Sequence, residues 1–423
     1  MESTVLTFAF AAALMGSLLV RFYLATRQMR HVATHRGAVP GAFVTQVSLE
    51  AHQRAADYTL AKGRLSLLEI SLGSAVLLGW TLLGGLDALN VQLLRTVQPQ
   101  WGNMAYQLAL LSAFALIGGL IDLPFDLYRT FVVEQFFGFN RMTLRLYLLD
   151  MAKGILLGAM IGLPIAAIIL WLMGAAGSTW WLWAWGVWVA FNLLILVLYP
   201  TLIAPLFNKF LPLTDEALKA RVQALMAKCG FSAKGLFVID GSRRSAHANA
   251  YFTGFGAAKR VVFFDTLLSK LTPGEVEAVL AHELGHFKHR HVIQRMIALF
   301  GFSAVGFAVL GLLSNQTWFY TALGVQPSLS AANDALALLL FMLVVPVFVF
   351  FVSPLMASLS RRHEFQADAY ACRQASGADL AQALLKLHED NAATLTPDPL
   401  YVRFFYSHPP AAQRIAALAA SPR

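Results

Sequence analysis

The residues of this chain best suited to chemistry are His282, Glu283 and His286, which form the pattern H-E-x-x-H. Side chains four positions apart on a helix share one face, so the two imidazoles can bind one metal ion. A glutamate beside the first histidine can accept a proton from water that the metal has made more acidic. The pattern therefore predicts a hydrolytic zinc site.

The sequence just before the pattern indicates where its helix begins. Thr272 is a suitable N-cap, Pro273 suits the first turn, and Glu275 completes a capping box. We therefore expect a metal-binding helix within residues 272–291, leading into the next hydrophobic stretch.

The two histidines need a third ligand, because catalytic zinc usually has three protein ligands, and two histidines with one glutamate are a known set. Glu364 is the best candidate, and Asp368 lies four positions later on the same helical face. Asp368 would orient a ligand imidazole or protonate a leaving group. The alternative for this pair is a charged helix surface without a ligand. His363 and His408 are the next candidates if Glu364 is not the ligand.

The composition is that of a membrane protein, with 58% hydrophobic and 13% charged residues among 423. Seven stretches reach the length of about 20 apolar residues that is needed to cross a bilayer. These are 4–24, 67–88, 106–125, 154–175, 182–204, 292–313 and 333–356. We therefore expect an α-helical polytopic membrane protein. Residues 1–205 form a membrane region with five spans, and residues 206–423 form a metallopeptidase region with two further spans.

The net charge of +9 could suggest nucleic-acid binding, but the positions of the Lys and Arg residues argue against it. These residues are concentrated in alternate connections between the spans. The connections after spans two, four and six contain only Arg95, whereas the other connections and the tail hold nearly all remaining Lys and Arg. Cationic loops mark the cytoplasmic side. We therefore predict an external N-terminus, a cytoplasmic C-terminus, residues 314–332 outside and residues 210–290 inside.

Residues 210–291 have the composition of a soluble unit. Helical periodicity covers 215–228, and strand composition covers 236–240, 247–255 and 260–264. The segment 247–254 is the candidate for an exposed edge strand, which can hold a peptide by main-chain hydrogen bonds.

Other polar residues receive no chemical role. His289 and His291 follow the motif on a basic segment, and we expect them to be solvated or interfacial. On a helix, His363 points about 100° away from Glu364. The charged stretch 122–141 is predicted to be an interfacial loop with ordinary ion pairs.

Together, the motifs resemble those of the type I CAAX prenyl proteases, which are integral-membrane zinc endopeptidases of the gluzincin type. The resemblance begins with H-E-L-G-H at 282–286 and S-R-x-x-E-x-x-A-D at 360–368. Further segments carry family signatures: Leu123–Tyr128, Phe137–Asn140, Ala204–Asn208, His247–Tyr251 and Ser407–Pro410. The shorter heat-shock membrane proteases share the zinc motifs but lack three N-terminal spans, so they fit less well.

The resemblance implies seven transmembrane helices that enclose a large water-filled chamber, with a small α+β zincin-like protease domain at the cytoplasmic end. It also implies one zinc ion per chain, held by His282, His286 and Glu364. Glu283 would be the general base.

Four more residues acquire roles through the resemblance. It implies that Asp368 is a second catalytic carboxylate and that Asn249 binds the backbone of the substrate. His408 would help to stabilise the oxyanion, and Arg414 would support that substrate-binding region.

The residues and the resemblance predict a zinc-dependent membrane endopeptidase that cuts peptides or proteins, lipid-modified ones included, near the cytoplasmic face. One alternative is a membrane-protein quality-control protease without CAAX specificity. In site-two proteases the motif lies inside a transmembrane span, and Lys288 and Arg290 argue against that arrangement here. The full set of base and ligands argues against a non-enzymatic scaffold or transporter. The Ala- and Leu-rich composition is typical of bacteria, so we expect a bacterial inner (cell) membrane. The sequence leaves the oligomeric state open.

Overall fold

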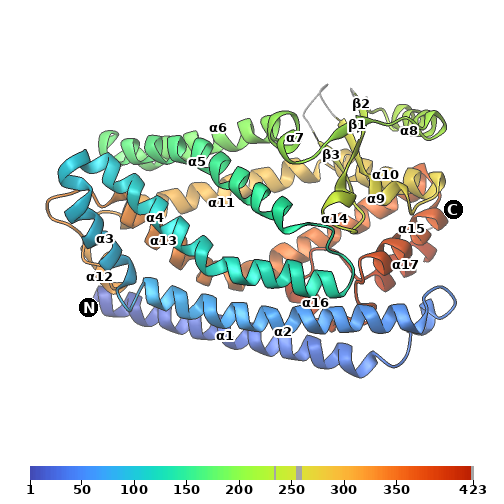
Figure 1. Cartoon of the computed structure of the whole chain (residues 1–423), viewed down its shortest axis with the longest axis horizontal. Coiled ribbons are helices and arrows are strands. Elements are labelled where there is room, and N and C mark those ends of the chain that lie inside the picture. The colour runs from blue at the N-terminus through green and yellow to red at the C-terminus, as the bar shows by residue number, and fades with distance from the viewer. Residues whose placement is uncertain (233–234, 254–259, 421–423) are drawn as a thin grey trace.

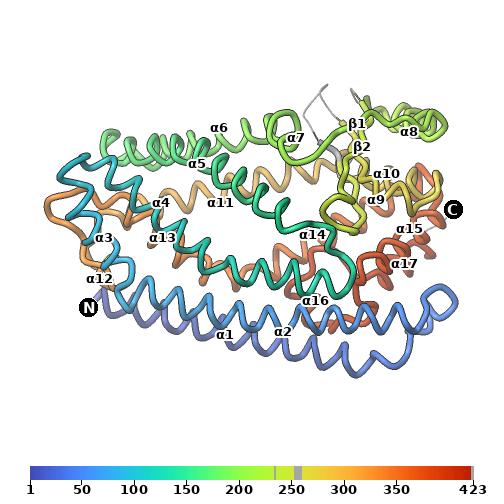
Figure 2. Tube along the Cα trace, viewed as in Figure 1, coloured from blue at the N-terminus to red at the C-terminus, as the bar shows by residue number. Residues whose placement is uncertain are grey.

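The structure is a computed structural model that describes residues 1–232, 235–253 and 260–420. Long helices run along its longest axis (Figure 1). On one side lie α1 (Glu2–His35) and α2 (Leu49–Trp80), and on the opposite side α5 (Leu144–Ala175) and α6 (Trp180–Leu198). Figure 2 shows α1 and α2 running side by side, with the N-terminus at the end opposite α17 (Ala411–Ala420).

Up to seven membrane-spanning segments are present in the described residues, which confirms the predicted fold class. Six are long and apolar enough by themselves: Glu2–His35, Gln98–Glu134, Leu144–Ala175, Gly177–Phe207, His291–Leu313 and Asp334–Gln374. The seventh is the pair α2 and α3 (Gly85–Thr96), which is bent by 49°. The predicted span 67–88 crosses this break and is therefore not one straight helix. Gly84 adopts a left-handed φ of 77° there, which glycine reaches without a steric penalty.

The helices are packed together at the end of the molecule that holds α3 and α12 (Thr317–Ala322) (Figure 1). There, α1, α4 (Gln98–Tyr128), α11 (His291–Leu313) and α13 (Asp334–Val349) contribute to one apolar cluster. Its fully buried members include Phe10, Leu86, Tyr106, Leu110 and Leu336. Helices in a membrane associate largely through such close packing, because lipid tails are as apolar as these side chains.

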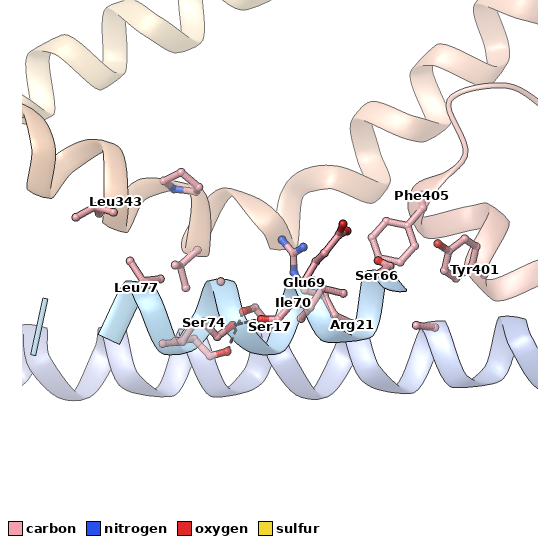
Figure 3. Close-up of a pocket in the computed structure, with 15 residues that line it drawn as sticks. Ser17, Arg21, Ser66, Glu69, Ile70, Ser74, Leu77, Leu343, Tyr401 and Phe405 are labelled. Carbon is pink, nitrogen blue, oxygen red and sulfur yellow. Dashed lines mark hydrogen bonds between the residues drawn. The ribbon is translucent and has the colours of Figure 1, made fainter. Parts of the chain in front are cut away.

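Elsewhere in the membrane region the helices enclose cavities. One of about 560 Å³ lies between α1, α2, α13 and α16 (Pro399–Phe405), and Figure 3 shows Arg21, Glu69, Leu343, Tyr401 and Phe405 around it. Two neighbouring cavities share Glu69 with it. We call these three cavities the chamber, and they lie where the resemblance implies a space between the membrane helices.

The small soluble unit is built on a four-stranded sheet of order β1-β2-β4-β3. In the described part of the chain, β1 (Phe210–Pro212) and β3 (Ala250–Thr253) are the edge strands, and β2 (Gly235–Ile239) runs parallel to β4 (Arg260–Phe264). Three strands match the predicted segments, and the edge position predicted around β3 is confirmed. Residues 254 and 255 of that prediction lie outside the described residues. The short strand β1 was not predicted, because three residues are too few to show a periodic pattern.

Helices α8 (Glu216–Lys228), α10 (Pro273–Lys288), α14 (Ser353–Gln374), α15 (Gly377–Asp390) and α17 share a second apolar core with the sheet. The helix predicted at 215–228 is confirmed as α8, and Asp215 caps it by accepting a hydrogen bond from the Leu218 N–H at 2.9 Å. Short elements complete the chain: η1 (Gly41–Phe43), η3 (Gly177–Thr179), η4 (Tyr199–Ile203), α7 (Ala204–Phe207), η5 (Gly241–Arg243), α9 (Asp265–Leu268) and η7 (Phe350–Val352).

The charged stretch 122–141 differs from the prediction in its backbone. The loop prediction is wrong for most of it, because α4 continues to Tyr128 and a π-helical segment, η2 (Arg129–Glu134), follows. The expected ion pairs are present, since Arg129 contacts Asp126 at 3.1 Å and also contacts Glu69 of α2.

Candidate metal site

The helix α10 begins as the sequence predicts. The Thr272 hydroxyl accepts a hydrogen bond from the Glu275 N–H, and the Glu275 carboxylate accepts one from the Thr272 N–H at 2.8 Å. The helix then places His282 and His286 on one face. It ends at Lys288, earlier than the predicted limit of 291, and α11 starts after Arg290, whose φ is 57°.

Gly285, between the two histidines, allows α14 to approach α10 closely. A Cβ at this position would lie 2.9 Å from the Cα of Ala367, closer than such atoms normally come. Any larger residue would therefore push the two helices apart. This approach brings Glu364 of α14 opposite the histidines of α10.

The side chains of His282, His286 and Glu364 converge on one point, with their ligand atoms within 4.8 Å of one another. The two Nε2 atoms are 3.2 Å apart, and each lies 3.5 Å from a carboxylate oxygen of Glu364. The Oε2 atom of Glu364 is buried without a hydrogen-bond donor in the described residues. A buried carboxylate oxygen facing two imidazole lone pairs fits a cation, and this donor set is one that zinc uses.

His282 is oriented by a buried acid. Its Nδ1 lies 2.8 Å from Oδ1 of Asp368, so Nδ1–H donates to the carboxylate and Nε2 keeps its lone pair for a metal. Arg414 in turn donates to both oxygens of Asp368, at 2.6 and 2.8 Å. Asp368 therefore has the geometry of the orienting residue, which was one of the two roles considered for it.

His286 is oriented by a histidine that sequence reasoning missed. Its Nδ1 lies 3.0 Å from Nδ1 of His291, and Nε2 of His291 lies 2.8 Å from Oε1 of Gln366. With His286 donating from Nδ1, His291 must accept at Nδ1 and donate from Nε2. His291 is only 1% exposed, so the prediction that it is solvated or interfacial is wrong.

No sequence signal pointed to this contact, because the backbone break at Arg290 changes the direction of the chain before His291. Helical spacing cannot be extended across such a break. His289 and His363 also lie beside His291, with ring centroids 5.5 and 4.0 Å from it. The His363 side chain is buried, and it does not belong to the ligand cluster.

Glu283 lines a cavity of about 330 Å³ together with the three ligands. Burial raises the pKa of its carboxyl group above the ordinary value. A carboxylate with a raised pKa is a better proton acceptor near neutral pH. This position and pKa suit the predicted general base.

His408 and Asn249 line the same cavity. His408 lies in the connection between α16 and α17, its side chain is 64% exposed, and its Nε2 is 3.5 Å from Oε1 of Glu364. Asn249 directly precedes the edge strand β3, and its side-chain oxygen accepts from the Ala250 N–H at 2.8 Å. Arg414 also lines the cavity, although its guanidinium is engaged with Asp368. All the predicted site residues are therefore brought together.

Comparison with known proteins shows the family of the chain. The family model described as CAAX prenyl protease N-terminal, five membrane helices, matches residues 28–209, and that of peptidase family M48 matches residues 212–421. A CAAX prenyl protease 1 homolog of Arabidopsis thaliana is 34% identical over 420 residues, covering 97% of each chain. CAAX prenyl protease 1 of Saccharomyces cerevisiae is 33% identical, covering 94% of this chain and 91% of its own. The chain belongs to the CAAX prenyl protease family of M48 peptidases.

The fold of this family member agrees with a solved relative. The crystal structure of S. mikatae Ste24p superposes with a TM-score of 0.91 at 30% sequence identity, covering 98% of this chain and 99% of that one. The protein is an integral, multi-pass membrane metalloendopeptidase that resembles CAAX prenyl protease. The prediction of an enzyme is thereby confirmed against the scaffold or transporter alternative.

Proposed function

We propose that His282, His286 and Glu364 bind one zinc ion per chain and that Glu283 is the general base of peptide hydrolysis. The ligand atoms of His282, His286 and Glu364 lie close together, and Oε2 of Glu364 is buried without a hydrogen-bond donor among the described residues. These two observations carry the proposal. When bound, zinc polarises a carbonyl and makes water more acidic. Glu283 takes the proton of the attacking water and then delivers it to the leaving amine.

The remaining site residues act on the substrate or on the ligands. Asn249, beside the edge strand β3, holds the peptide backbone, and His408 donates a hydrogen bond to the developing oxyanion. Asp368 positions His282, and Arg414 keeps Asp368 in place. The substrates are peptides or proteins, lipid-modified ones included, as the names of the relatives suggest.

The activity can be tested on the full-length protein purified in detergent. Casein is incubated with the protein, and the products are identified by mass spectrometry. We expect cleavage that a chelator stops and added zinc restores. The matched variant Glu283→Gln should yield no new termini; equal cleavage by this variant would show a contaminating protease.

We also propose that the protein lies in a bacterial inner membrane, with the N-terminus outside, the C-terminus in the cytoplasm, and a division between regions at residues 205 and 206. The positive charge of the predicted cytoplasmic connections supports this orientation. Single cysteines at exposed Leu329 and exposed Arg243 test it, after Cys229 and Cys372 are replaced. An impermeant reagent should label Leu329→Cys in intact cells and Arg243→Cys only after lysis. The reverse result would overturn the orientation.

A further inference from the structure

The chamber lies beside the metal-site cavity, because neighbouring cavities have wall residues in common. The cavity of Figure 3 shares Ser66, Glu69 and Tyr401 with a second chamber cavity of about 470 Å³. That second cavity shares Asn391 and Ala393 with the cavity that contains the metal ligands. The cavity that contains the metal ligands is therefore a direct neighbour of the chamber.

Arg21 is a cation in the chamber without an anion. Its guanidinium lies over the ring of Phe350, with its Cζ 4.3 Å from the ring centroid. It forms no hydrogen bond or ion pair with any residue in the described ranges, although it is half-buried. A ring face attracts the cation but leaves its N–H donors free. Figure 3 shows Arg21 and Glu69 both projecting from their helices into the cavity.

The nearby carboxylates are already engaged. Glu69 contacts Arg129, and Glu134 accepts a hydrogen bond from Tyr58 at 2.6 Å. Lys62, which lines the second cavity, also lies over an aromatic ring, with its Nζ 4.7 Å from the centroid of Tyr58. Within the described residues it forms no ion pair closer than 4 Å, although the Glu134 carboxylate is near enough to attract it. The linings of these two chamber cavities have an excess of positive charge, because Arg21, Lys62 and Arg129 face one carboxylate, that of Glu69.

We propose that Arg21 binds the C-terminal carboxylate of the peptide substrate, and that Lys62 adds positive potential along the path from the metal site. A cation among apolar side chains gains most from a hydrogen-bonded anion, and a free carboxylate accepts two parallel N–H bonds from a guanidinium. Every unmodified peptide carries such a group at one end. The residues after the cleaved bond would then lie in the chamber, because the cations repel a free amino terminus. This inference rests on the proposed peptidase function.

The test compares one peptide in two forms. A peptide spanning a bond that the protein cuts in casein is made with a C-terminal carboxylate and with a C-terminal carboxamide. For the parent protein we expect the carboxamide to raise KM about 10- to 100-fold at nearly unchanged kcat, since a hydrogen bond to a charged group is stronger than one to a neutral amide. In Arg21→Gln the two forms should have equal KM, and Arg21→Lys should recover part of the difference.

The controls separate this inference from its alternatives. Arg145→Gln removes an exposed cation that lines none of these cavities and should behave like the parent. Zinc content and thermal stability show whether Arg21→Gln is folded, and Lys62→Gln provides a second variant with a smaller expected effect. If the parent cuts the peptide but treats both forms alike, this inference fails and the peptidase function stands. If Arg21→Gln instead loses binding of phosphatidylglycerol vesicles and still prefers the carboxylate form, the cation serves a lipid phosphate and the inference is wrong.

Discussion

At the metal site each candidate ligand imidazole is hydrogen-bonded to a second side chain, whereas Arg21 in the chamber contacts an aromatic ring and, within the described residues, no hydrogen-bond acceptor. The two regions are adjacent, and both contain charges inside a largely apolar protein. At the metal site the partners come from the chain itself. In the chamber Arg129 pairs with Glu69, but Arg21 has no such partner within the described residues.

This difference fits the roles proposed for the two regions. A catalytic metal requires ligands that are already oriented, because a loosely held imidazole loses affinity and geometry. A substrate group that enters and leaves requires donors that are not already paired. Variants of the metal site should therefore change zinc binding or turnover, whereas variants of the chamber should change KM.

The largest effect is expected from removing a ligand. His286→Ala should reduce bound zinc from one per chain to none and abolish hydrolysis, because two ligands cannot hold the ion tightly. Glu364→Ala should weaken zinc binding strongly. Elemental analysis of the purified protein measures both, with His289→Ala as the matched control on the same segment. Full zinc content in Glu364→Ala would disprove Glu364 as the third ligand.

Next in size is the removal of the base. Glu283→Gln should lower kcat by about 100- to 10,000-fold, because general base catalysis is lost, while zinc content stays at the parent level. Glu277→Gln on the same helix is the matched control, since Glu277 pairs with Arg221. Turnover at the parent rate in Glu283→Gln would refute the mechanism.

Smaller effects on kinetics are expected from replacing His408 and Asn249, and the two variants should differ in which constant changes. His408→Ala should lower kcat by about 100- to 1,000-fold with zinc retained, as expected for one donor to developing negative charge. Asn249→Ala should mainly raise KM, because a group that holds the backbone acts before and during the reaction. Thermal stability is measured in parallel. Activity of His408→Ala that falls only in proportion to lost folded protein would remove the catalytic role.

The smallest of these effects concerns His291. His291→Phe should weaken zinc affinity about 10- to 100-fold, because His286 loses the acceptor for its Nδ1–H. His291→Asn keeps an acceptor near the same place and should restore most of the affinity. His289→Phe is the control for ring packing. Equal zinc affinities in His291→Phe and the parent would show that the contact does not orient the ligand.

Much of the candidate site could be predicted because the H-E-x-x-H pattern and its helix cap lie within one short segment. The spacing of His282, Glu283 and His286 and the cap at Thr272 depend only on helix geometry, which four to five residues specify. The membrane spans could also be predicted, since bilayer thickness requires long apolar stretches. The helix and its cap agree with the structure, and so do the spans except 67–88, which the bend between α2 and α3 interrupts.

The sequence by itself therefore determined the membrane class and predicted the ligand types and the base, because each depends on residue type and short-range spacing. Only the tertiary structure decided that His291 supports His286, since a left-handed residue at position 290 separates their helices. It also decided that Arg414 contacts Asp368 and that Arg21 lacks an anion among the described residues. These contacts join segments that are far apart in the chain. Which distant charges meet depends on how the helices pack, and the spacing of residues within one helix does not specify that packing.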